Sequence, residues 1–123
     1  MITRLSDSLL LQPRDIQPTQ SGLEVIGVFN PAVARVDDDL IMLARIAERP
    51  NEDRVGWTAL PRWTDDRQTA IDWVRDHDLR KTDARVVTIK HGGDLRLTSV
   101  SHFQIFRQSP GDQTWELIGA VVP

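Results

Sequence analysis

Two polar residues lie where the sequence predicts the interior of strands. Asn30 precedes Pro31 at the start of one apolar strand, residues 29–36, and Arg45 lies near the end of a second apolar run at residues 40–48. A buried guanidinium needs a carboxylate, a backbone carbonyl or a ligand, because burying an unpaired charge is very costly. Each residue also has an alternative interpretation. Arg45 could be a surface arginine on an edge strand that pairs with Glu48. Asn30 could serve only to form the turn before the proline.

Two tryptophans form a second candidate feature. Trp57 and Trp63 flank Pro61, which is expected to end a strand at residues 55–60. An indole ring suits the apolar face of a sugar ring, so both side chains are candidates for sugar stacking. Packing within a core is the alternative role for such large aromatic side chains.

Composition limits the functions that this chain can have. The chain has 123 residues, which predicts a single domain, and its 15 basic and 18 acidic residues are interspersed, with a net charge of −3. No basic stripe suggests a nucleic-acid partner, and no apolar run reaches the length of a membrane span. There is no cysteine, and His77, His91 and His102 lack metal-ligand spacing, so neither a metal nor an organic cofactor is expected. The N-terminus lacks the pattern of a secretory signal, so a cytoplasmic location is expected.

The pattern of short apolar segments predicts an all-β fold built from antiparallel meanders. Residues 1–21 contain two prolines and are expected to form an extended arm. An acidic turn at residues 37–39 joins the first two long strands, and a glycine turn at residues 91–94 joins a later hairpin. Alternating or continuous apolar runs predict strands at residues 23–29, 29–36, 40–48, 55–60, 70–74, 85–90, 95–100, 103–107 and 115–118.

The segment at residues 67–80 is ambiguous. Ala70, Ile71 and Val74 fit a short amphipathic helix with Thr69 as its cap, and the same residues also alternate as a strand does. We predict a strand. A helix here would instead indicate an α+β domain of unknown role.

Two ordered stretches carry a family resemblance. "GVFNPAVARVDDDLIMLARIAERP" at residues 27–50 and "LRLTSVSHF" at residues 95–103 resemble segments of the family 130 glycoside phosphorylases and hydrolases, which act on β-mannosides. The resemblance implies a five-bladed β-propeller, of which this chain is either the N-terminal portion or a short relative that covers its exposed sheet edges by association. Blades of about 40–50 residues give this chain two to three blades, which form an incomplete ring. The exposed sheet edges of such a ring are expected to drive homo-oligomer formation.

The resemblance also implies roles for individual residues. Asn30 and Arg45 match positions that contact the sugar next to the cleaved bond, where an amide and a guanidinium hold neighbouring hydroxyl groups. His102 in the second stretch and Arg107, which keeps a basic position beyond it, are further substrate-binding candidates, although a lone histidine beside strands is also a typical packing residue. Gln104 and Phe106 depart from the family pattern.

Asp83 is a weak candidate for the catalytic acid. Inverting cleavage requires a carboxylic acid, and the family's acid lies in an Asp-Pro-Arg motif, whereas this chain has Asp83-Ala84-Arg85. We expect the true motif to lie outside this sequence and Asp83 to be a turn residue. The predicted function is therefore part of the sugar site of a β-mannoside phosphorylase or hydrolase, inactive alone, with inorganic phosphate as co-substrate if the full enzyme is a phosphorylase. The alternative is a non-catalytic β-protein for carbohydrate binding or self-association.

Overall fold

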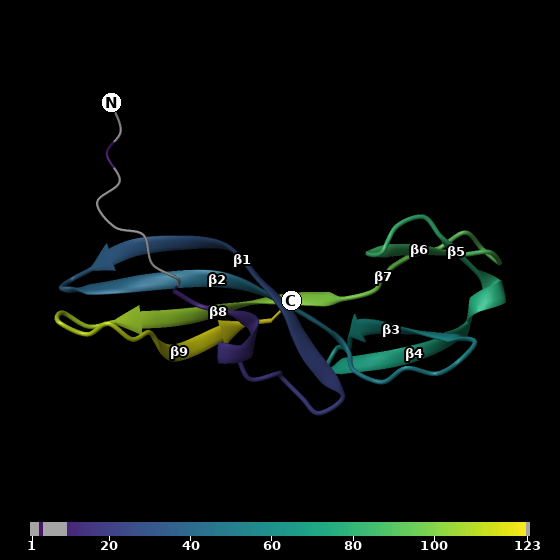
Figure 1. Ribbon diagram of the computed structural model, residues 1–123, viewed down its shortest axis with the longest axis horizontal. Coiled ribbons are helices and arrows are strands. Elements are labelled where there is room, and N and C mark those ends of the chain that lie inside the picture. The colour runs from purple at the N-terminus through teal and green to yellow at the C-terminus, as the bar shows by residue number, and fades with distance from the viewer. Residues whose placement is uncertain (1–2, 4–9, 123) are drawn as a thin grey trace.

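The computed structural model describes residue 3 and residues 10–122, and these form an all-β fold (Figure 1). Short 3-10 turns at Pro13–Asp15 (η1) and Asp76–Asp78 (η2) are the helical segments of the described residues. All strand pairs are antiparallel, as the sequence predicts. The strands are β1 (Leu23–Val36), β2 (Asp39–Pro50), β3 (Trp57–Trp63), β4 (Thr69–Arg75), β5 (Leu79–Lys81), β6 (Val86–Ile89), β7 (Leu95–Leu97), β8 (Val100–Gln108) and β9 (Glu116–Val121).

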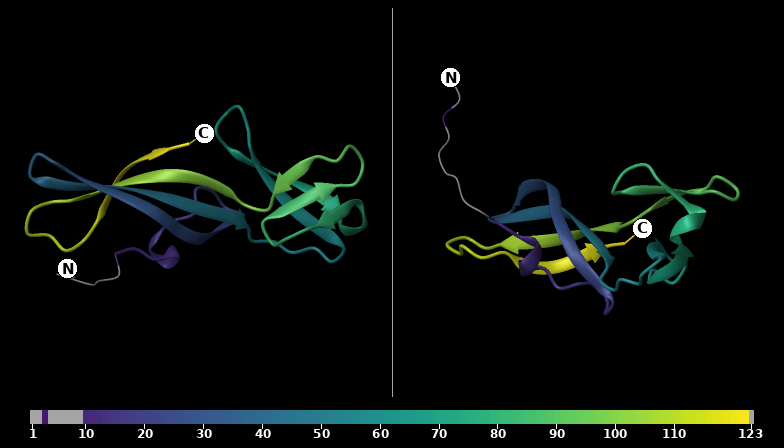
Figure 2. Two further views of the ribbon diagram at one scale, coloured as in Figure 1. Left: turned by 90° about the horizontal axis from the view of Figure 1, so that it is seen from above. Right: turned by 45° about the vertical axis from the view of Figure 1, so that its right-hand side comes forward.

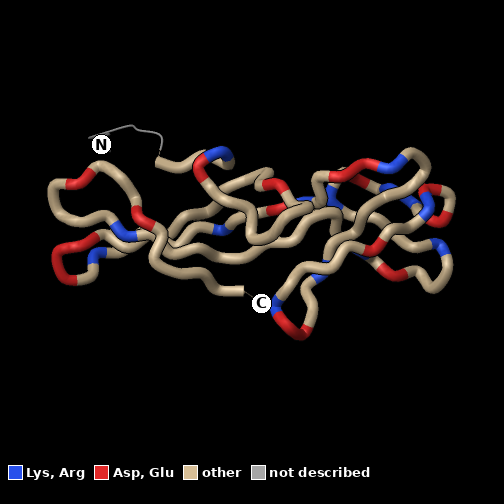
Figure 3. The backbone as a smooth tube through the Cα atoms, turned by 90° about the horizontal axis from the view of Figure 1, so that it is seen from below, with Lys and Arg blue, Asp and Glu red and all other residues tan. Residues whose placement is uncertain are grey.

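The strands form three sheets that lie in two groups. Strands β1, β2, β8 and β9 form one four-stranded sheet, in that order. The hairpin β3–β4 and the three-stranded sheet β5–β6–β7 lie together at the other end of the molecule (Figures 1 and 2). The chain leaves the first group after β2 and returns in β8, so the two long central strands connect both groups. Acidic and basic residues are interspersed over both groups (Figure 3).

The first hairpin contains a bulge at the position of Asn30. Residues Phe29 and Ala32 pair with Arg45 and Leu43, so Asn30 and Pro31 together form a register shift in β1. Asn30 has a φ of 47°, in the left-handed region that asparagine tolerates better than most residues. Proline cannot donate to a ladder, but β1 is an edge strand, and a bulge on an edge strand accommodates it.

Two small clusters of buried apolar residues hold the sheets together. One face of the four-stranded sheet buries Met42, Ala44, Ile46 and Phe106 against Ile16, which follows η1. The second cluster joins Leu60 of β3 to Leu79 and Val87 of the three-stranded sheet. Residues 10–21 of the expected arm thus contain a 3-10 turn and a core residue, and residues 1, 2 and 4–9 lie outside the described part.

The opposite face of the four-stranded sheet is open. Phe29, Leu43, Phe103 and Val121 are each between 36% and 53% exposed. Phe103 pairs with both Arg45 and Val121, so these side chains emerge on one face. The sheet therefore has one buried face and one apolar face in solvent.

Two local expectations are settled by the strands near residue 60. Pro61 does not end a strand, because β3 continues through it to Trp63. The prediction was wrong because β3 pairs with β4 alone, so a missing N–H on its free side breaks no ladder. The segment at residues 67–80 is confirmed as strand, since β4 runs from Thr69 to Arg75 before the short turn η2.

Candidate sugar-binding site

A pocket rich in arginine lies where the two groups of strands meet. Its volume is about 750 Å³, and we call it the arginine pocket. Strands β2, β3 and β7 contribute its walls, together with the first residues of β6 and β8 and the loop residues just before them. The lining residues are Arg45, Pro61, Arg62, Trp63, Arg85, Val86, Leu95, Arg96, Leu97, Ser99, Val100 and Ser101.

The charge of the arginine pocket is positive, because its lining has four arginines and no carboxylate. Arg62 Nε and Arg96 Nη2 each lie 2.9 Å from a carboxylate oxygen of Asp72, which lies behind the lining on β4. Burial opposes the charged form of Asp72, but the hydrogen bonds from Arg96 and Arg62 outweigh it and hold the pKa of Asp72 below its ordinary value. Asp72 thus fixes two of the four guanidinium groups.

Arg45 is held at the pocket by an aromatic ring. Its guanidinium carbon lies 5.5 Å from the centre of the Phe29 ring on the neighbouring strand, within the range of a cation–π interaction. The ring itself lies over Gly27, where a Cβ atom would fall 2.0 Å from the ring. Gly27 therefore makes room for the ring that supports Arg45. Arg45 is exposed, and its polar hydrogens are available to a ligand.

Glu48 is not the partner of Arg45. Side chains three positions apart on a strand point to opposite faces, and Glu48 is fully buried on the face away from Arg45. Its carboxylate accepts hydrogen bonds from the Thr19 backbone N–H at 2.6 Å and the Thr19 hydroxyl at 2.7 Å. The interpretation of Arg45 as an ion-pair partner of Glu48 was therefore wrong.

Asn30 and Arg45 do not come together in the arginine pocket. Asn30 is exposed at the bulge and is not among the residues that line the pocket, whereas Arg45 lines it. The left-handed φ of Asn30 fits its interpretation as a turn residue before Pro31. Contact of Asn30 with a sugar stays a prediction.

The two candidate tryptophans lie in different pockets. Trp63 lines the arginine pocket, whereas Trp57 lines a second pocket near the start of β3. Six residues of extended strand place them about 20 Å apart along the chain. One sugar ring cannot contact both side chains.

His102 lies behind Trp63 rather than in the open pocket. It is 2% exposed, its ring meets that of Trp63 edge to face at 6.3 Å, and its Nε2 lies 3.1 Å from the Gln104 side-chain nitrogen. Its Nδ1 lies 3.7 Å from a carboxylate oxygen of Glu48. Burial lowers the pKa of His102, and the charge of Glu48 opposes that shift in part. This placement suits a packing residue, and a substrate-binding role for His102 stays a prediction.

Arg107 lies far along β8 from the arginine pocket. It pairs with Ile41, four positions from the pairing of Phe103 with Arg45, which is about 13 Å along the strand. Its guanidinium donates to Glu116 at 2.9 Å, and this hydrogen bond raises the pKa of Arg107 above its ordinary value. The structure does not bring Arg107 together with the other candidates.

Asp83 forms a turn beside the arginine pocket. Its Oδ1 accepts hydrogen bonds from the backbone N–H groups of Arg85, at 2.7 Å, and Val86, at 3.1 Å. The bond from Arg85 is the main reason why the pKa of Asp83 lies below its ordinary value. A catalytic acid must keep its proton near neutral pH, so this geometry fits the turn role better. Arg85 nevertheless lines the pocket, which places Asp83 at its edge.

Sequence reasoning missed Arg62 and Arg96 as site residues, along with the burial of Glu48. Arg62 follows a proline and Arg96 alternates with two leucines, so both resemble ordinary solvent-facing positions of strands. The signal that was available is the position of Arg96 inside the second matched stretch. Nothing local in the sequence indicates that Asp72 joins the two arginines.

The fold and the pocket define an all-β chain with a polar, cationic cleft at the junction of two sheet groups.

No family model matches the chain. It is 30% identical over 115 residues to a β-1,2-mannobiose phosphorylase from Listeria innocua, covering 89% of this chain and 32% of that protein.

The solved complex of β-1,2-mannobiose phosphorylase from Listeria innocua with β-1,2-mannobiose matches with a TM-score of 0.71 and 29% identity. This match covers 89% of this chain and 32% of the other. The chain therefore spans about a third of the length of that relative. Sequence and fold together confirm the resemblance to the family 130 enzymes, and the all-β architecture is that of part of a β-propeller.

Proposed function

We propose that this chain forms part of the sugar-binding wall of a β-mannoside phosphorylase or hydrolase. The observation that carries the proposal is the arginine pocket, in which Arg45 of the first matched stretch meets Arg96, Ser99 and Ser101 of the second. The similarity to a phosphorylase that was solved with β-1,2-mannobiose supports a mannoside as the ligand.

The pocket has the groups that a sugar requires. The guanidinium of Arg45 donates paired hydrogen bonds to neighbouring hydroxyls, while the two serine hydroxyls donate or accept. Trp63 supplies an apolar ring at the same wall, and His102 fixes that ring from behind. Arg62 and Arg96 are held by Asp72, so they present a fixed positive edge.

Sugar binding is tested by calorimetric titration of this chain with β-1,2-mannobiose. We expect binding that weakens about tenfold or more in Arg45→Ala, because a charged hydrogen-bonding group contributes about 1.5–3 kcal/mol. Arg107→Ala is the matched control, since Arg107 lies outside the pocket, and it is expected to bind normally. Equal affinity of Arg45→Ala and the unsubstituted chain would overturn the proposal.

Catalysis is a separate part of the proposal. Inverting cleavage needs a protonated carboxyl group to donate a proton to the leaving oxygen. The attacking group is either phosphate or a water molecule that a base activates. No carboxylate lines the arginine pocket, so the chain alone is expected to be inactive toward β-1,2-mannobiose with or without phosphate. Turnover with phosphate that disappears in Asp83→Asn would show instead that Asp83 is the acid and that this chain holds the catalytic motif.

The open face of the four-stranded sheet favours a second candidate function, self-association. Phe29, Leu43, Phe103 and Val121 expose apolar surface on that face, and the edge strands β1 and β9 have unpaired backbone groups. Light scattering is expected to show a dimer that dissociates in Phe103→Glu. A monomer across the micromolar range would remove this candidate.

A further inference from the structure

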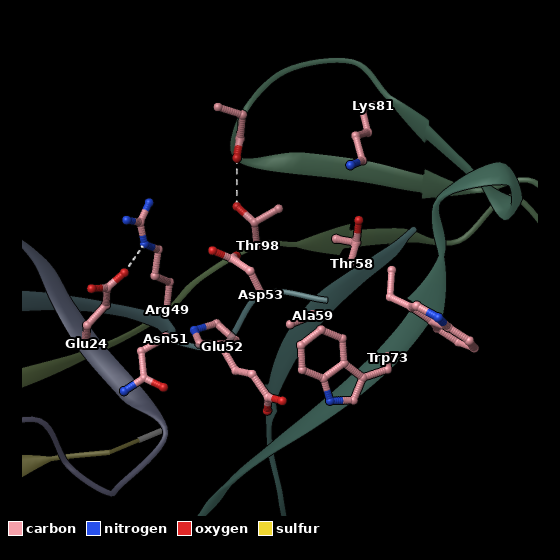
Figure 4. Close-up of a pocket in the computed structure, with 13 residues that line it drawn as sticks. Glu24, Arg49, Asn51, Glu52, Asp53, Thr58, Ala59, Trp73, Lys81 and Thr98 are labelled. Atoms are coloured by element: carbon pink, nitrogen blue, oxygen red, sulfur yellow. Dashed lines mark hydrogen bonds and ion pairs between the residues drawn. The ribbon is translucent and has the colours of Figure 1, made fainter. Parts of the chain in front are cut away.

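A second pocket lies on the other side of the chain segments that border the arginine pocket. It has a volume of about 560 Å³, and we call it the tryptophan pocket. Ala84 and Thr98 face it, joined by a hydrogen bond of 2.8 Å, whereas Arg85 and Ser99 face the arginine pocket. Figure 4 shows its polar side chains around an open centre. The lining residues are Glu24, Arg49, Pro50, Asn51, Glu52, Asp53, Trp57, Thr58, Ala59, Trp73, Lys81, Ala84 and Thr98.

Two indole rings form one wall of the tryptophan pocket. Trp57 pairs with Arg75, and Ala59 pairs with Trp73, so all four side chains lie on one face of the β3–β4 hairpin. Trp57 and Trp73 are therefore diagonal neighbours, with Cβ atoms about 7–8 Å apart. The small Ala59 leaves a depression beside the two rings. Trp57 is 40% exposed, although large aromatic side chains gain most from burial.

The charges around the two rings select the class of ligand. The guanidinium of Arg54 lies 4.0 Å from the centre of the Trp73 ring, and that of Arg75 lies 5.1 Å from the centre of the Trp57 ring. Arg54 is paired with Glu52 at 3.2 Å, whereas the guanidinium of Arg75 would repel a cationic ligand. Asp53 lines the same pocket, and its carboxylate would repel an anion.

The polar rim of the pocket suits a neutral ligand with several hydroxyl groups. Arg49 is oriented by Glu24 at 2.5 Å, and Lys81 lies 3.5 Å from Asp76, so both cations are already neutralised locally. Asn51 can donate and accept hydrogen bonds, and Asp53 can accept two. A ligand that stacks an apolar face on indole and places hydroxyls against such groups is a sugar.

We propose that the tryptophan pocket is a second carbohydrate-binding site, which takes a neutral pyranose unit of an oligosaccharide. Trp57 and Trp73 contact the apolar face of the ring, and Asn51 and Asp53 bind its hydroxyl groups. The site is separate from the arginine pocket and does not depend on the function proposed for it. In this proposal Trp57 has the sugar-stacking role that the sequence suggests. The sequence does not indicate that Trp57 lies in a different pocket from Trp63.

The test isolates this pocket by first removing the other. The full chain with Arg45→Ala and Trp63→Ala is titrated calorimetrically with four neutral disaccharides: β-1,2-mannobiose, cellobiose, lactose and maltose. We expect one equivalent of at least one disaccharide to bind at millimolar concentration. Adding Trp57→Ala is expected to weaken that binding about tenfold or more. Trp57→Ala and Trp63→Ala each remove one indole ring from β3, and each ring lines a different pocket. Comparing the loss of affinity in the two variants therefore separates the two pockets.

A variant that keeps both indole rings guards against loss of folding. Ala59→Leu fills the depression beside the rings and is expected to weaken binding about tenfold, with an unchanged far-ultraviolet circular dichroism spectrum. Binding that is lost in Arg45→Ala and is unaffected by Trp57→Ala and Ala59→Leu overturns this proposal and leaves the arginine pocket as the sugar site. The proposal is also overturned if no disaccharide binds to the chain with Arg45→Ala and Trp63→Ala.

Discussion

Replacing Glu48 with alanine is the sharpest test of how the N-terminal segment is attached to the sheet. Glu48 is fully buried, and its two oxygens accept hydrogen bonds of 2.6 and 2.7 Å from Thr19. Glu48→Ala leaves the Thr19 N–H and hydroxyl without these acceptors and removes the negative charge beside His102. Each hydrogen bond to a charged group contributes about 1.5–3 kcal/mol, so losing both bonds to Glu48 costs about 3–5 kcal/mol.

We therefore expect Glu48→Ala to lower the free energy of unfolding by about 3–5 kcal/mol, measured by urea denaturation. This is a large part of the roughly 5–15 kcal/mol that stabilises a small domain. The melting temperature should fall by roughly 12–20 °C, from about 4 °C for each kcal/mol at this chain length. Glu48→Gln keeps one acceptor oxygen, so it is expected to cost less than the alanine variant.

The matched control is Glu116→Ala. Glu116 also accepts a hydrogen bond from another strand, at 2.9 Å from Arg107, but its side chain is 66% exposed. Exposed ion pairs contribute about 0–1 kcal/mol, so this variant should have nearly the stability of the unsubstituted chain. Equal losses for Glu48→Ala and Glu116→Ala, each under about 1 kcal/mol, would refute the reasoning, because they would show that water replaces Thr19 at Glu48.

Three further predictions concern His102, Asn30 and Arg96. The pKa of His102 is lowered in the folded state, so the contribution of the neutral ring to stability is complete above about pH 6.5 and is lost as the pH falls toward the lowered pKa. Urea denaturation at several pH values should show this loss of stability. His102→Gln should remove the pH dependence. Asn30→Gly should leave stability within about 0.5 kcal/mol and Asn30→Val should cost about 1–2 kcal/mol, because φ is 47°. Arg96→Ala breaks bonds to Asp72 and to the Leu60 carbonyl and should cost about 1–3 kcal/mol in urea denaturation, more than Arg62→Ala, whose guanidinium is more exposed.

Each of these predictions has an outcome that contradicts it. A pH dependence that is unchanged in His102→Gln would assign the titration to another group. Equal costs for Asn30→Gly and Asn30→Val would mean that the left-handed backbone is not what selects asparagine. If Arg62→Ala costs more than Arg96→Ala, the more exposed of the two contacts with Asp72 is the one that matters.

Much of the strand pattern was predictable, because it depends on neighbours along the chain. Alternation in the hairpin β6–β7 and the glycines at residues 92 and 93, both with positive φ, indicated a turn that the structure contains. The acidic turn after Val36 was also expected, and Asp37 has a φ of 54° there. Pro61 misled the prediction because a proline is harmful only where its missing N–H faces a partner strand, and that depends on which strands pair.

The candidate sites were less predictable, because their residues come from distant parts of the chain. Trp57 and Trp63 are close in sequence, but an extended strand separates them into two pockets. Arg62 and Arg96 are 34 positions apart in the sequence, and Asp72 brings them together.

The sequence by itself determined the all-β class, the turns and the strand carrying Arg45, since the preferences behind them act over two to four residues. The tertiary structure decided which polar side chains are buried and which line a pocket. Glu48 is the clearest case. Its burial depends on Thr19, 29 positions earlier, and the free energy of that contact exists only after the N-terminal segment has packed on the sheet.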